Sequence, residues 1–175
     1  GGGVAFVAHL DGMVTRLDRE GRVTLRASVA ATDVRGIGWD RLRNRLYLSS
    51  RAGHLIIVGA GTLREEGRLK LPGPAYGLAV NQGTGRVFTV DADNNRLYAV
   101  EPDAAGVTTL LLPAQGGDQG GQGVAVWDNR VAVANYGAGS LTIIADAVCA
   151  EQLTPTAGVP PVPTATPTRT AQPTA

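Results

Sequence analysis

Short apolar runs bounded by turn residues follow one another along most of this chain. The clearest example is the stretch RVFTVDADNNRLYAVEPD at residues 86–103. Its apolar run at 87–90 is followed by turn residues at 91–95 and by a second apolar run at 97–100. Asp and Asn suit such a turn because they tolerate positive φ and bond to their own backbone. The pattern therefore predicts a β-hairpin.

The same pattern recurs at regular intervals. The sequences GIGW at 36–39, GLAV at 77–80 and GVAV at 123–126 lie 41 and 46 residues apart. Each is followed by a polar turn and then by an Arg and an apolar run. The aromatic residues Phe6, Tyr47 and Phe88 are also 41 residues apart. Such a period indicates a repeat architecture in which each copy is one supersecondary unit.

Each copy predicts about four strands in roughly 40 residues, which is typical of a β-propeller blade. We therefore expect an all-β fold, a β-propeller of about four blades of four antiparallel strands. The expected blades span residues 4–35, 36–75, 76–121 and 122–153, with no inner strand in the first copy and a weak outer strand at 148–153. Small residues in the innermost strands suit a crowded axis. A β-sandwich of short strands is the alternative, but it gives no reason for the 41-residue spacing.

Residues 154–175 differ in kind from the repeats. They contain six Pro and seven Thr, with Arg169 as the one charged residue. Such a segment buries too little apolar surface to offset its ordering entropy. We expect a disordered Pro/Thr-rich stalk or interdomain linker, and a stalk of this kind favours an extracellular or cell-surface location.

Composition narrows the choice of partners. The net charge is +1 with dispersed charges, which argues against a nucleic-acid-binding face. Cys149 is the one cysteine, so no disulfide within the chain is possible, and we interpret it as a small buried hydrophobe. No apolar run reaches 18 residues, so we expect no transmembrane segment in this sequence.

The last copy, RVAVANYGAGSLTIIAD at 130–146, resembles the YVTN family of β-propeller repeats. Ala134-Asn135 matches the end of that family's strand, and the third copy is equally similar to an NHL repeat. These families close rings of six to eight blades, so the resemblance implies that four blades form an incomplete ring; a closed four-bladed ring is the alternative. They host sensors, surface proteins, lactonases and lyases, so the resemblance implies a fold more than a function.

In a propeller, the turns between the second and third strands and the links between blades open on one face, where ligands bind. Here that face is expected to carry the turns 9–12, 51–53, 91–95 and 135–139. Its candidate ligand-binding residues are His9, Asp11, Asp33, Arg35, Tyr76, Asp91, Asp93, Asn94, Asn95, Asn135 and Tyr136. Asp91 and Asp93 could hold calcium, although turn capping explains them better because no EF-hand spacing follows.

We expect a non-catalytic scaffold that binds a protein, glycan or small-molecule partner on this face, in an exported or surface-associated bacterial protein. The sequence contains neither a nucleophile elbow nor a phosphate-binding fingerprint. The alternative is a lactonase-like or streptogramin-lyase-like enzyme with a metal-assisted site at the channel mouth. That site would use Asp91, Asp93, Asn135 and His9.

Overall fold

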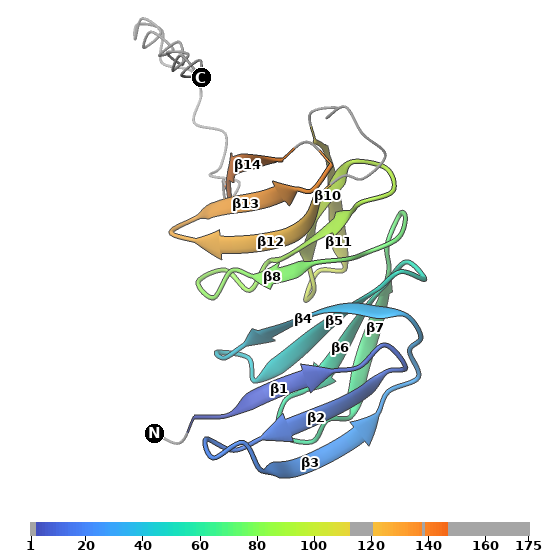
Figure 1. Ribbon diagram of the computed structural model, residues 1–175, viewed down its shortest axis with the longest axis vertical. Helices are drawn as coiled ribbons and strands as arrows, with labels where there is room; N and C mark the ends of the chain where they lie inside the picture. Colours follow the sequence, from blue (N-terminus) through green and yellow to red (C-terminus); the bar gives the residue numbers. More distant parts are fainter. Residues whose placement is uncertain (1–2, 113–120, 138, 147–175) are drawn as a thin grey trace, which may run out of the picture.

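The computed structural model describes residues 3–112, 121–137 and 139–146, which form β-strands joined by turns (Figure 1). Strands that follow each other in sequence pair antiparallel into four separate sheets, here called blades 1 to 4. Blade 1 consists of β1 (Ala5–Ala8), β2 (Met13–Leu17) and β3 (Val23–Ser28). Blade 2 consists of β4 (Val34–Asp40), β5 (Arg45–Ser50), β6 (His54–Gly59) and β7 (Glu65–Lys70). Blades 3 and 4 consist of β8 (Leu78–Val80), β9 (Val87–Asp91), β10 (Arg96–Glu101) and β11 (Gly106–Leu111), then β12 (Gly121–Trp127), β13 (Arg130–Asn135) and β14 (Ser140–Ala145).

The hairpin expected at 86–103 is confirmed as β9 and β10. Val87 pairs with Val100 and Asp91 pairs with Arg96 at the two ends of the ladder. Asn95 completes the turn with a φ of 52°, in the left-handed region that Asn tolerates. The sequence pattern therefore located both the strands and the turn.

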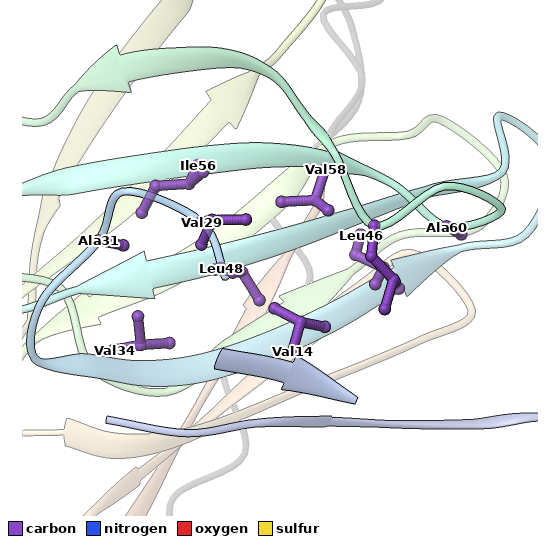
Figure 2. Close-up of a cluster of buried hydrophobic side chains, with 10 residues drawn as sticks. Val14, Val29, Ala31, Val34, Leu46, Leu48, Ile56, Val58 and Ala60 are labelled. Atoms are coloured by element: carbon purple, nitrogen blue, oxygen red, sulfur yellow. The ribbon is translucent and has the colours of Figure 1, made fainter. Parts of the chain in front are cut away.

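Apolar side chains fill the three joints between successive blades. Figure 2 shows the first joint, where Val14 of β2 lies against Leu46 and Leu48 of β5 and Val58 of β6. Tyr47 and Leu55 of blade 2 pack with Val87 and Val100 of blade 3 in the second joint. The third joint, between blades 3 and 4, is formed by Phe88, Val90, Leu97, Ala99, Leu112, Val131 and Val133. The core is thus a series of sheet-to-sheet contacts, which a two-sheet sandwich does not provide, and the sandwich alternative is wrong.

The strands β4, β8 and β12 contact one another in sequence and form the inner edge of the arrangement. Little space remains there for side chains. A Cβ added to Gly36 would lie 2.6 Å from Ser49 Oγ and 2.7 Å from the backbone oxygen of Tyr76. The expectation of small residues in the innermost strands is confirmed at this position.

The ring is open, because blades 1 and 4 lie at opposite ends of the arrangement (Figure 1). In the described residues blade 1 has three strands and begins with a strand equivalent to β5. The outer strand expected at 148–153, the Pro/Thr segment 154–175 and Cys149 lie outside the described residues. In the described part of the chain no helix is long and apolar enough to cross a membrane.

Candidate ligand-binding face

The turns β1–β2, β5–β6, β9–β10 and β13–β14 all lie at the same end of their blades. Each joins equivalent strands of an antiparallel sheet, so successive blades place it at the same end. The links between blades, at 29–33 and 71–77, run along this end as well. We call this end the loop face, and it agrees with the face expected from the sequence.

Three side chains meet on the loop face between blades 2 and 3. The Tyr76 hydroxyl donates to Asp93 Oδ1 at 2.8 Å. Arg51 lies over the Tyr76 ring, with its guanidinium carbon 6.0 Å from the ring centroid, and its Nε is 3.8 Å from Asp93 Oδ2. Burial and the hydrogen bond to Asp93 raise the pKa of Tyr76. The Arg51, Asp93 and Tyr76 cluster, called the RDY cluster below, therefore presents a half-exposed cation held by an aromatic ring and a carboxylate.

A shallow pocket opens beside the RDY cluster. It is lined by the β5–β6 turn and by the link that follows β7, namely Arg51, Ala52, Gly53, Lys70, Leu71, Pro72, Gly73 and Pro74. Arg51 and Lys70 are its charged lining residues, and both are cations. The pocket therefore combines positive charge with the rigid apolar surface of two prolines.

Asp33, just before β4, and Arg35, near the start of β4, extend the charged surface toward blade 1. Arg35 Nη2 is 2.6 Å from Asp33 Oδ1, and both side chains are more than a third exposed. The backbone N–H of Arg51 donates to the Asp33 carbonyl at 3.0 Å, which ties this link to the β5–β6 turn. Asp33 and Arg35 thus lie beside Arg51 of the β5–β6 turn.

Asp91 has a different role from Asp93. Its side chain is buried, and Tyr98 Oη donates to Asp91 Oδ2 at 2.7 Å. The backbone N–H and side-chain amide of Asn94 donate to Asp91 Oδ1, each at 3.1 Å, and these bonds close the turn. Burial and the bond to Asp91 raise the pKa of Tyr98 to about 12. The capping interpretation therefore accounts for Asp91, and the side chain does not reach the surface of the loop face.

The other candidates lie within their own hairpins. Asp11 Oδ1 accepts the Met13 N–H at 3.0 Å, and His9 Nε2 is 3.5 Å from Thr15 Oγ1. Asn135 is buried, and its amide donates to Thr142 Oγ1 at 2.9 Å and to Ser140 Oγ at 3.2 Å. Tyr136 follows it and is 74% exposed. Within the described ranges, no three His, Cys, Asp or Glu side chains are placed to hold a metal ion.

The opposite end of the blades carries ion pairs that the sequence did not predict. Arg45 Nη1 is 2.8 Å from Asp103 Oδ1, which links blade 2 to blade 3. Arg86 Nη1 is 2.6 Å from Asp146 Oδ1, which links blade 3 to the end of blade 4. Both arginines occupy the position that precedes the apolar run in each copy. That repeated Arg was the available signal, and its partners required knowledge of which blade ends meet.

The sequence also missed part of the loop face. The turn 51–53 was expected there, but Arg51 was not singled out, and Lys70 was not considered. Both belong to a pocket that forms only when the link after β7 folds back onto the β5–β6 turn. Tyr76 and Asp93 were both candidates, and the structure places them in contact.

No family model and no curated protein matches the chain in sequence. Solved structures do match its fold. Hydrazine synthase of Kuenenia stuttgartiensis aligns with a TM-score of 0.68 at 14% identity, over 80% of this chain and 42% of that chain. Virginiamycin B lyase of Staphylococcus aureus aligns with a TM-score of 0.65 at 10% identity, over 82% and 52%. The WD40 β-propeller domain of Doa1 aligns with a TM-score of 0.62 at 14% identity, over 79% and 45%.

These similarities show the β-propeller fold and do not extend to function, because all identities are low. The chain spans about half the length of the propeller chains that it matches. The finer resemblance to YVTN or NHL repeats stays a prediction.

Proposed function

We propose that this chain is a non-catalytic β-propeller scaffold whose loop face binds a protein partner through that partner's carboxylate groups. The observation that carries the proposal is the RDY cluster beside a pocket lined by Arg51 and Lys70. Tyr76 and Asp93 hold the Arg51 side chain, so it loses less conformational freedom when a partner binds. A guanidinium presents a planar set of donors that matches a carboxylate.

The residue types of this site are those that contribute most at protein interfaces. Arg and Tyr are enriched among interface residues with large effects on affinity. Arg51 and Asp93 keep about half of their side-chain surface exposed, so both are available to a partner. Because Asp93 adds a negative charge at one edge, it would disfavour partners whose acidic groups reach past the pocket.

We further propose that the protein is exported or surface-associated and bacterial. The Pro/Thr-rich composition of residues 154–175 supports this location, because Pro-rich segments act as semi-rigid spacers and Thr-rich segments with Pro are typical of O-glycosylated stalks. The resemblance of residues 130–146 to YVTN repeats supports it as well. In this view the stalk would hold the loop face away from the surface.

The second candidate is a hydrolase or lyase with a metal-assisted site at the channel mouth. The likeness to a lyase is a likeness of fold and carries no residue with it. Of the four side chains that this enzyme would use, His9, Asp91 and Asn135 make their contacts inside their own hairpins. The binding scaffold is therefore the better supported function.

An acidic-peptide array and a glycan array probed with the purified chain would test the proposal. We expect selective binding to acidic peptides, and its loss in Arg51→Glu. Arg64→Glu makes the same charge change in the β6–β7 turn at the opposite end and should keep the binding. Equal profiles for the two variants, or binding confined to glycans, would overturn the proposal.

A further inference from the structure

The two end blades expose faces that are buried at every internal joint. In blades 2 and 3 the second residues of the third strands, Leu55 and Leu97, are fully buried against the next blade. The equivalent residue of blade 4 is Leu141, which is 60% exposed. Ile143, two residues further along the same strand, is 54% exposed. Blade 4 therefore presents a surface of the kind that packs against a further blade.

We call this surface of blade 4 its front face. Cross-strand pairing shows which residues form it. Leu141 pairs with Ala134, and Ile143 pairs with Ala132, so these four residues lie on one side of the sheet. Trp127 pairs with Arg130 on the same side and is 41% exposed. Leu141, Ile143 and Trp127 are therefore exposed apolar neighbours on one sheet face, and contiguous apolar patches of this kind mark interaction surfaces.

Blade 1 exposes the opposite side of its sheet, here called the back face, which in the other blades packs against the preceding blade. Ala5 pairs with Leu17, and Leu17 pairs with Val23, which forms an apolar row across its three strands. Val7 is 40% exposed, whereas Leu48, its equivalent in blade 2, is fully buried against blade 1. The back face of blade 1 is thus built to receive the front face of a preceding blade.

Charge supports the match between these two faces. At the second and third joints an Arg that precedes or begins the second strand reaches an acid just after the third strand of the next blade, in the pairs Arg45–Asp103 and Arg86–Asp146. Arg130 begins β13 and is exposed in blade 4. Asp18 directly follows β2 of blade 1, as Asp146 directly follows β14. Arg130 and Asp18 would therefore form the equivalent ion pair if blade 4 packed on blade 1.

We propose that two copies of this chain associate head to tail, with the front face of blade 4 in one copy packed on the back face of blade 1 in the other. One copy cannot join its own ends, because its blades cover only part of a ring (Figure 1). The chain aligns with 42% to 52% of the length of the propeller chains quoted above, so two copies together match the length of one such chain. In such a dimer two identical joints close the ring. A head-to-tail interface that does not close in this way produces an open polymer.

Sedimentation equilibrium of the purified chain tests this assembly. We expect a species of twice the 18.0 kDa chain mass. Leu141→Glu and Val7→Glu should each abolish it, while Leu42→Glu should not, because Leu42 is 75% exposed in the β4–β5 turn, away from both faces. Circular dichroism establishes that the variants remain folded. A monomeric wild type, an open polymer, or equal behaviour of Leu141→Glu and Leu42→Glu would overturn the proposal.

A mixing experiment distinguishes head-to-tail from face-to-face association. Leu141→Glu keeps an intact back face and Val7→Glu keeps an intact front face, so an equimolar mixture should recover mixed dimers that neither variant forms alone. Charge reversal gives a second readout. Arg130→Glu and Asp18→Arg should each raise the dimer dissociation constant, and the double variant should restore it. If neither the mixture nor the double variant restored the dimer, the assigned pair of faces would be contradicted.

Discussion

Arg86 and Asp146 form an ion pair across the joint between blades 3 and 4, with Nη1 of the arginine 2.6 Å from Oδ1 of the aspartate. The Asp146 side chain is fully buried, and its other oxygen accepts Asn81 Nδ2 at 2.6 Å. A buried carboxylate needs these partners, because removing one leaves an uncompensated charge in a poorly solvated site. The end of blade 4 is therefore fixed to blade 3 by charge as well as by apolar packing.

Replacement of Arg86 by Ala should lower the free energy of unfolding by about 3 kcal/mol, because Asp146 would lose its counter-charge. Urea unfolding followed by circular dichroism measures the change. Arg19→Ala is the matched control, because Arg19 pairs with Glu20 at an exposed site and should cost less than about 1 kcal/mol. Equal effects of the two substitutions would contradict the structural role of the Arg86 pair.

Gly36→Ala should destabilise the chain by about 1–3 kcal/mol, because the added methyl group would overpack the inner strand. Its Cβ would lie 2.6 Å from Ser49 Oγ, closer than unbonded atoms approach. Gly61→Ala is the control, since its Cβ would meet the Asn44 amide at an ordinary 3.6 Å. Thermal unfolding of both variants compares the two sites, and a neutral Gly36→Ala would show that the inner edge is less crowded than described.

Alkaline pH should destabilise the fold through Tyr98. Its pKa is raised from 10.0 to about 12 by burial and by the bond to Asp91, so the neutral phenol is favoured in the folded state. The stability that Tyr98 contributes is therefore complete below pH 10 and is lost as the pH rises from 10 toward 12. Tyr98→Phe should be less stable at neutral pH and should lack this loss.

Unfolding midpoints in urea across that range measure the effect of Tyr98. Tyr136→Phe is the control, because Tyr136 is 74% exposed and should leave the stability profile unchanged. If Tyr98→Phe keeps the full alkaline loss, another group is responsible for it.

Acid should weaken the joint between blades 2 and 3. The hydrogen bond from Arg45 holds the pKa of Asp103 below its ordinary value of 3.8. A carboxylate whose pKa is lowered in the folded state stabilises the fold at pH values above its ordinary pKa. That stability is lost as the pH falls through the lower folded-state pKa. Asp103→Asn should reduce the loss of stability below pH 3.8, as measured by urea midpoints. The effect should be small because Asp103 is exposed, and an unchanged acid profile would contradict it.

The sequence predicted the blades because each blade is a local unit. The spacing of Phe6, Tyr47 and Phe88 reports the period directly, and hairpin turns such as 91–95 carry their own chemical signal. Side-chain roles were less predictable. Asp91 and Asp93 look alike in sequence, yet one is buried beneath Tyr98 and the other reaches Tyr76 on the surface. Strand alternation alone did not decide which of the two carboxylates would reach the surface.

Contacts between blades were beyond the sequence pattern for a physical reason. Arg45 and Asp103 are 58 residues apart, and they meet only because the two blades stack in a fixed register. The pocket at Arg51 likewise depends on the path of the link after β7. Local propensity specifies strands and turns, whereas these sites depend on how one blade is placed on the next.

The proposed binding role of the loop face is tested most directly by titrating the acidic peptide selected on the array into the wild-type chain and three variants. The variants are Arg51→Ala, Tyr76→Phe and the opposite-end control Arg64→Ala. We predict that Arg51→Ala weakens binding at least tenfold, about 1.4 kcal/mol, that Tyr76→Phe weakens it less, and that Arg64→Ala leaves it unchanged. Equal affinities for Arg51→Ala and Arg64→Ala would contradict a binding site at the RDY cluster.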